Sequence, residues 1–382
     1  MADSVLLNGK TVSEKERNYG IDLLRILSMF MVVVLHVNKY ANLLGNYNAD
    51  SYVFVWFSEA FAICAVNVYA IISGYVLFNS KFKLKRLLQL YIEVLFFRLI
   101  SYVLMATVYD NFYGFTDLIK GLIFVLPLQG TYFWYFKAYF LLYLIFPILN
   151  IAVKNMTKGQ FILLFTVLAV FVCIVTQYGY GWGFEEGYSF IWLVAMYFIG
   201  AYFKKFGLLK ISALKGFLIY CGLSILILAW KTLNDLVLPP IKINTVKEAF
   251  DFKYDPIAYT SIFVVLQAVF LFNSFAKIQI KSGFWQKAVL FVSPLTFGVY
   301  SVHCTDFVKV LLGKFDFIIN SSVLLIIPLT IGCALAVFIG CAVIEWIKQQ
   351  IFKYAKIDKL TFKVGDFIQN KITAFADKKA EE

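Results

Sequence analysis

The sequence predicts an all-α, polytopic membrane helical bundle. Apolar residues make up 61% of the 382 positions and charged residues only 15%, which is far from the composition of soluble domains. Apolar runs also recur at the length that an α-helix needs to cross a bilayer. The segments between these runs are too short to fold as domains by themselves, so the working surface is expected inside the membrane domain.

We expect about ten transmembrane helices of about 17–25 residues each. The stretch Phe115 to Gln129 is apolar but brief and closes on Pro127, so we expect a re-entrant or interfacial half-helix there. The expected spans, in chain order, are Ile21–Tyr40, Tyr52–Phe78, Leu87–Tyr109, Tyr132–Val153, Phe161–Tyr178, Phe190–Phe203, Phe217–Lys231, Ile257–Phe275, Ala288–Leu312 and Ser321–Ile347.

Basic residues predict the orientation of the spans. Most of the 35 Lys and Arg residues fall on one side of the membrane if the N-terminus is cytoplasmic, which places both termini inside and the segment Thr232 to Pro256 outside. The expected organisation is a cytoplasmic tail (1–20), a transmembrane domain (21–350) and a second cytoplasmic tail (351–382). Anchoring of basic loops to anionic membrane lipids accounts for the net charge of +12, so no nucleic-acid partner is expected.

The first span carries two ionisable residues, Arg25 and His36. Eleven residues advance a helix by about three turns, so both side chains share one face roughly 16 Å apart. Ionisable groups at membrane depth usually mark a site, which favours a cationic clamp and a general base. The alternative, an arginine that extends to the interface and an interfacial histidine, explains Arg25 better than His36.

Four further polar or aromatic positions are candidates for substrate contact. Depth alone places Glu59 level with His36, where a carboxylate would fix the imidazole tautomer. Arg98 lies near the middle of the third span. Trp134 and Tyr135 offer stacking faces for a sugar, although a belt of aromatic residues at the membrane interface explains them equally well.

Cysteine and histidine usage argues against a metal site and against a Cys–His nucleophile. The six cysteines are dispersed without paired spacing, and the chain has only two histidines, so no metal site is expected. Cys304 adjoins His303, but neighbouring side chains on a helix point apart, so a Cys–His nucleophile is not predicted.

Several short motifs, in this order and at this spacing, resemble the acyltransferase-3 family of integral-membrane O-acyltransferases. The resemblance covers nearly the whole chain. The motifs are Arg25 with His36, the span-two ending Asn67-Val-Tyr-Ala-Ile-Ile-Ser73-Gly74-Tyr75, the basic run Lys83-Leu-Lys85-Arg86, the run Tyr132-Phe-Trp134-Tyr135 leading to Pro147, and Thr296-Phe-Gly298-Val-Tyr300-Ser-Val-His303.

The resemblance implies roles for the first two motifs. Arg25 and His36 match a pair associated with donor handling and catalysis. Ser73 and Gly74 match a Ser-Gly of the second span, where a small residue allows close backbone approach. The members modify bacterial cell-envelope glycans, so the implied location is the plasma or inner membrane.

The resemblance also implies the co-substrate, acetyl-CoA or another short acyl-CoA. The family commonly has Arg, two residues, Arg after the second span, and Lys83 and Arg86 stand at those positions here, with Lys85 between them. Lys holds a phosphate as a point charge and cannot form the planar fork of Arg. His36 is the expected base, and His303 is expected to assist it or to stabilise the oxyanion.

The expected function is therefore transfer of an acyl group, most simply acetyl, to a hydroxyl of an envelope or lipid-linked saccharide, without a metal ion. A secondary transporter or an exporter of a lipid-linked glycan or small anion would share the spans and the intramembrane charges. It would also be expected to show repeat symmetry between its halves, and none is visible in the sequence.

Overall fold

The computed structural model describes residues 17–45, 47, 50–108, 123, 126–128, 133–173, 183–237 and 255–381. Within these ranges the chain is helical and has no β-strand, which confirms the predicted fold class. The α-helices are α1 (Tyr19–Tyr40), α2 (Tyr52–Ala62), α3 (Ala65–Leu77), α4 (Leu84–Val108), α6 (Trp134–Asn155), α7 (Lys158–Val167), α8 (Phe190–Phe206), α9 (Ala213–Thr232), α10 (Ile262–Ala276), α11 (Gly283–Val292), α12 (Thr296–His303), α13 (Asp306–Leu312), α14 (Ile326–Tyr354) and α15 (Ile357–Glu381).

Six of the described helices are long and apolar enough to cross a membrane. A seventh span results if the bent pair Gly283–His303 and Asp306–Ile318, which meet at 83°, is counted as one. The predicted count of ten is not confirmed. The segments at the fifth and eighth expected spans form shorter apolar helices, Lys158–Val172 and Ile262–Ala276, and the sixth forms α8, which is 17 residues long. The half-helix expected at 115–129 and the outer segment 232–256 fall largely outside the described residues.

Polar side chains fix several helix starts, as the free N–H groups of a first turn require. The Asn18 side chain accepts from the backbone N–H of Ile21 at 3.2 Å and begins α1. Thr157 and Gln160 form a reciprocal capping box at the start of α7. Gly207 ends α8 with φ of 91°, a conformation that glycine adopts without strain.

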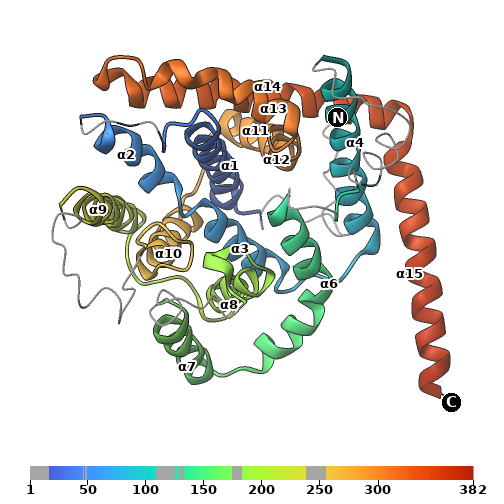
Figure 1. Cartoon of the computed structure of the whole chain (residues 1–382). Coiled ribbons are helices and arrows are strands. Elements are labelled where there is room, and N and C mark those ends of the chain that lie inside the picture. Colours follow the sequence, from blue (N-terminus) through green and yellow to red (C-terminus); the bar gives the residue numbers. More distant parts are fainter. Residues whose placement is uncertain are drawn as a thin grey trace.

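The core lies around α1 and the α2–α3 segment. In Figure 1, α1 and α3 are near the middle of the bundle, and α2 runs inward from its left edge. Their apolar windows are 67% and 72% buried, whereas those of the other candidate spans are 22% to 39% buried. Outward-facing residues of the peripheral helices are apolar, for example Ile148 on α6 and Leu163 on α7. This distribution is expected when lipid, rather than water, covers the outer surface.

Two glycines bring α3 and α8 into close contact. A Cβ atom at Gly74 would overlap the backbone oxygen of Tyr197, and one at Gly200 would overlap the backbone oxygen of Ile71. Small residues let helix backbones approach in this way. Gly74 therefore has the packing role that was expected of it, and it does not line the cavity described below.

The region expected as a second tail contains a further long helix, α15, which extends along one side of the molecule to the C-terminus (Figure 1). Lys85 forms an ion pair with Asp366 at 3.0 Å, and the Leu84 backbone N–H donates to the Gln369 side chain at 2.9 Å. These contacts hold α15 against the start of α4. The boundaries between tail and transmembrane domain stay predictions.

Candidate active site

One face of α1 lines a cavity of about 1360 Å³. Arg25, Met29, Val32 and His36 contribute to its wall, at the spacing of a single helical face. The prediction that Arg25 and His36 share a face is therefore confirmed. Along the axis of α1 the two residues are roughly 16 Å apart.

The hydrogen bonds of α1 show how α2 and α3 run beside it. Asn38 Nδ2 donates to Glu59 Oε2 at 2.8 Å, and the Tyr69 hydroxyl donates to the backbone oxygen of Arg25 at 2.6 Å. Residue numbers fall along α1 as they rise along α2 and α3, so the two segments are antiparallel. The loop after α3 consequently lies beyond Arg25, and His36 lies toward the opposite end of the cavity.

Arg25 lies in a small charge network at the start of α1. Its Nη1 contacts Asp22 Oδ1 at 2.8 Å, and the same carboxylate contacts Arg17 Nε at 2.7 Å. Ser293 also donates to Asp22, at 3.3 Å. Because one carboxylate serves two guanidinium groups, a net positive charge remains at this part of the cavity wall.

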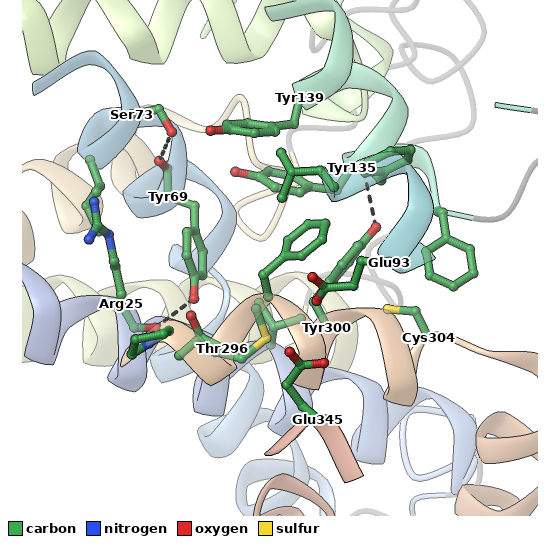
Figure 2. A pocket seen from close by; sticks show the side chains of 18 of the residues that line it. Arg25, Tyr69, Ser73, Glu93, Tyr135, Tyr139, Thr296, Tyr300, Cys304 and Glu345 are labelled. Atoms are coloured by element: carbon green, nitrogen blue, oxygen red, sulfur yellow. Dashed lines mark hydrogen bonds between the residues drawn. The ribbon is translucent and has the colours of Figure 1, made fainter. Parts of the chain in front are cut away.

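Four cations that follow α3 line the same cavity, and we call them the basic end: Lys81, Lys83, Lys85 and Arg86. Arg86 Nη1 donates to the Gln89 side chain at 3.2 Å, while Lys85 is paired with Asp366. Partial burial, with the charges of Lys85 and Arg86, lowers the pKa of Lys83. Ser73 lines the wall nearby and donates to the backbone oxygen of Tyr69 at 2.8 Å (Figure 2).

At the opposite end three side chains form what we call the imidazole–thiol cluster: His36, His303 and Cys304. The two imidazole centroids are 4.9 Å apart. Cys304 Sγ lies 3.6 Å from His303 Nε2 and 3.9 Å from His36 Nδ1. The three potential ligand atoms lie within 4.8 Å of one another, close enough to share one metal ion, a proximity that sequence spacing does not show.

The expectation that His303 and Cys304 point apart is wrong. Helix α12 ends at His303, and the chain bends by 83° before α13 begins at Asp306. The i, i+1 rule applies to residues inside a continuous helix. At this bend the thiol and the imidazole face each other. Cys304 and His36 line the cavity, and His303 lies fully buried behind them.

Aromatic rings form the wall between the basic end and the cluster. Tyr135 and Tyr139 are nearly parallel, with centroids 6.3 Å apart, and Tyr300 faces them from α12 (Figure 2). Trp134 also lines the cavity and packs against the ring of Tyr188 at 4.8 Å. Both predicted aromatic residues, Trp134 and Tyr135, are therefore part of the cavity wall.

Two other predicted contact residues, Glu59 and Arg98, are placed differently from expectation. Glu59 lines the cavity, but its hydrogen bond goes to Asn38, and no bond joins it to His36 among the described residues. Arg98 does not line the cavity. It donates to the backbone oxygen of Leu126 at 3.0 Å and lies 5.6 Å from the ring centre of Phe133.

Sequence reasoning missed a buried charge cluster on the cavity wall. Lys348 Nζ on α14 contacts Glu345 Oε1 at 2.9 Å and Glu93 Oε2, on α4, at 3.1 Å. A Cβ atom at Gly298 would overlap the Glu345 side chain, which explains the glycine of the Thr296-Phe-Gly298 motif. Glu93 and Glu345 are far apart in the chain, so only the i, i+3 spacing of Glu345 and Lys348 was visible in advance.

The cavity thus combines a positive end, an aromatic middle and a buried imidazole–thiol end. Phosphate groups suit the basic end, since Lys and Arg bind them by charge-assisted hydrogen bonds. Imidazole and thiol groups away from bulk water can exchange protons and act as nucleophiles. An elongated anionic molecule that lies along α1 would bring its far end to His36.

Comparisons with known proteins bear on this site. The family model of the acyltransferase-3 domain matches residues 18–346, a range that contains every residue of the basic end and of the imidazole–thiol cluster. Comparison with curated proteins and with solved structures gave no match. The match covers far more than half of the chain. The chain therefore belongs to the acyltransferase-3 family and is a membrane acyltransferase.

Proposed function

We propose that the protein is an O-acetyltransferase of the bacterial plasma or inner membrane. It moves an acetyl group from acetyl-CoA to a hydroxyl of a cell-surface or lipid-linked saccharide. The observation that carries this proposal is the continuity of the cavity, because one space joins the cations of the basic end to His36.

The dimensions of the cavity support a CoA thioester as donor. Its phosphates bind at the basic end, where Lys83 and Arg86 line the wall and Arg25 adds positive charge further in. The pantetheine arm then extends along α1 between aromatic side chains. The thioester at its tip comes to lie beside His36, roughly 16 Å beyond Arg25.

The chemistry of transfer needs a base at that position. An acceptor hydroxyl must lose its proton as its oxygen attacks the thioester carbonyl, and a neutral imidazole accepts such a proton. His36 supplies the imidazole at the cavity wall. Trp134 and Tyr135 supply aromatic faces on which a sugar ring stacks.

Acyl-CoA is made in the cytoplasm, so the proposal requires that the basic end faces the cytoplasm. The excess of Lys and Arg in the segments on that side supports this orientation, with both termini inside. The saccharide then enters from the other side of the membrane, nearer to His36.

The decisive test is release of CoA thiol by the purified protein from acetyl-CoA in the presence of a saccharide acceptor. We expect His36→Ala to lower this activity by about 100-fold or more, the usual contribution of a general base. Val34→Ala is the matched control, because Val34 is buried on α1 but does not line the cavity. It should remain active.

Mass spectrometry of envelope glycans from cells that carry each variant gives an independent result. Normal acetylation in well-expressed His36→Ala cells would contradict the assignment of the base. A protein that carries a glycan or anion across vesicle membranes without releasing any thiol would be a transporter, and the acyltransferase proposal would fail.

A further inference from the structure

We infer that Cys304 carries the acyl group as a thioester between donor and acceptor. This inference rests on the proposed function and adds a covalent step to it. The cavity then works by two successive transfers, with donor and acceptor present in turn. Among the described cysteines Cys304 alone lines the cavity, and none of the six is in a disulfide.

His303 is placed to activate this thiol. Its Nδ1 lies 2.6 Å from the backbone oxygen of Val299, and a carbonyl oxygen only accepts hydrogen bonds, so Nδ1 carries the ring proton. The lone pair is therefore on Nε2, which lies 3.6 Å from Cys304 Sγ. Covalent catalysis commonly uses this arrangement. A nucleophile lies beside a base, and a third group fixes the orientation of the base.

His36 approaches the same sulfur from α1. Its Nδ1 lies 3.9 Å from Cys304 Sγ. The ring of His36 lines the cavity, whereas the ring of His303 does not. The two histidines thus differ in access. His303 reaches only the thiol, whereas His36 reaches both the thiol and whatever occupies the cavity.

The first step exchanges one thioester for another. His303 takes the Cys304 proton, the sulfur attacks the carbonyl of the acyl-CoA, and the bond from that carbonyl to the CoA sulfur breaks. The CoA sulfur leaves as a thiolate, because the buried His303 does not reach it, and His303 keeps the Cys304 proton. Because a thioester is replaced by a thioester, the step is close to balanced in free energy and needs no other reactant.

The second step passes the acyl group to the acceptor. His36 removes the proton of the saccharide hydroxyl as its oxygen attacks the Cys304 thioester. The bond from the carbonyl to Cys304 Sγ breaks, an ester forms, and the sulfur takes its proton back from His303. The proton on His36 passes to solvent and balances the CoA thiolate released in the first step. The enzyme returns to its starting state.

Isotope exchange distinguishes this relay from direct transfer. The full-length protein is incubated with acetyl-CoA and tritiated CoA without any saccharide. A covalent acyl-enzyme requires that label enters acetyl-CoA, whereas direct transfer allows no exchange. We expect exchange in the wild type and in Cys341→Ala, a buried cysteine that does not line the cavity, and at least a 100-fold loss in Cys304→Ala.

Peptide mass spectrometry should locate one acetyl group on Cys304 after incubation with acetyl-CoA, and neutral hydroxylamine should remove it. The relay is overturned if a wild-type protein that acetylates its acceptor shows no exchange, a result that does not depend on any variant. It is also overturned if Cys304→Ala acetylates the acceptor at the wild-type rate. Failure of the wild type to bind CoA at all would instead overturn the proposed function together with the relay.

Discussion

At the scale of single residues, the cations of the cavity differ in how much of their charge is available. Asp22 partly neutralises Arg17 and Arg25, and Asp366 pairs with Lys85. Lys83 forms no ion pair within the described part of the chain, and its pKa is lowered by burial and by the charges of Lys85 and Arg86. It is therefore the cation whose charge depends most on pH.

This difference predicts a pH dependence for donor binding. A lowered pKa means that Lys83 loses its proton earlier than an ordinary lysine as the pH rises, so affinity for CoA should fall in the alkaline range. Lys83→Arg should bind CoA with a flatter alkaline profile, because a guanidinium group keeps its charge. Titration of CoA affinity against pH measures both.

Lys158→Arg is the control, since Lys158 is exposed at the start of α7 and does not line the cavity. Its profile should match that of the wild type. Identical profiles for the wild type and Lys83→Arg would show that the charge of Lys83 does not contribute to donor binding.

The residues that sequence reasoning found are those whose relation is local. Arg25 and His36 belong to one helix, so their spacing alone predicts a shared face. Cys304 could not be found, because its approach to His303 depends on an 83° bend that the apolar pattern does not encode. The predicted Glu59–His36 pair is not formed, for a similar reason. Equal depth in the membrane does not determine which neighbour a side chain contacts, and Glu59 contacts Asn38.

At the scale of elements, helices were predicted well and spans less well. A helix occupies each of the ten expected segments, because runs of apolar residues identify helices reliably. Length is harder to predict, because the 83° bend at Cys304–Thr305 interrupts a run that looks continuous in the sequence. Such breaks depend on neighbouring helices, which a single sequence does not show.

The contact between α3 and α8 gives an element-scale prediction. Gly74→Ala places a methyl group against the backbone of Tyr197, which can move only if α8 moves. We expect it to lower the free energy of unfolding by about 1–3 kcal/mol, the usual cost of overpacking. Thermal unfolding of the detergent-solubilised protein measures this loss.

Gly222→Ala on α9 is the matched control, because no atom lies within 4 Å of the position of its added Cβ. Alanine is the better helix former, so this variant should be unchanged or stabilised by up to about 1 kcal/mol. If Gly74→Ala proved as stable as Gly222→Ala, close approach of α3 and α8 would not be what Gly74 provides.

At the scale of the whole molecule, the two ends of the cavity must face opposite sides of the membrane for the proposed function. The helix α14 is long and apolar enough to run from one side of the membrane to the other. Lys353 near its end lines the cavity with the basic end, whereas Ser322 precedes its start, so about 29 residues or roughly 40 Å of helix separate them. Two exposed positions, Asn79 and Ser322, therefore mark the two sides.

This separation predicts the result of cysteine labelling in intact cells. Cys221 and Cys333 are half-buried and Cys304 lines the cavity, so these three cysteines are first replaced by Ala. With an impermeant maleimide, Ser322→Cys should react in intact cells, and Asn79→Cys should react only after lysis. Acyl-CoA cannot cross the bilayer, so the basic end has to be inside for the donor to reach it. If Asn79→Cys reacted in intact cells, the cations of the basic end would face the exterior, and a donor other than cytoplasmic acyl-CoA would have to bind there.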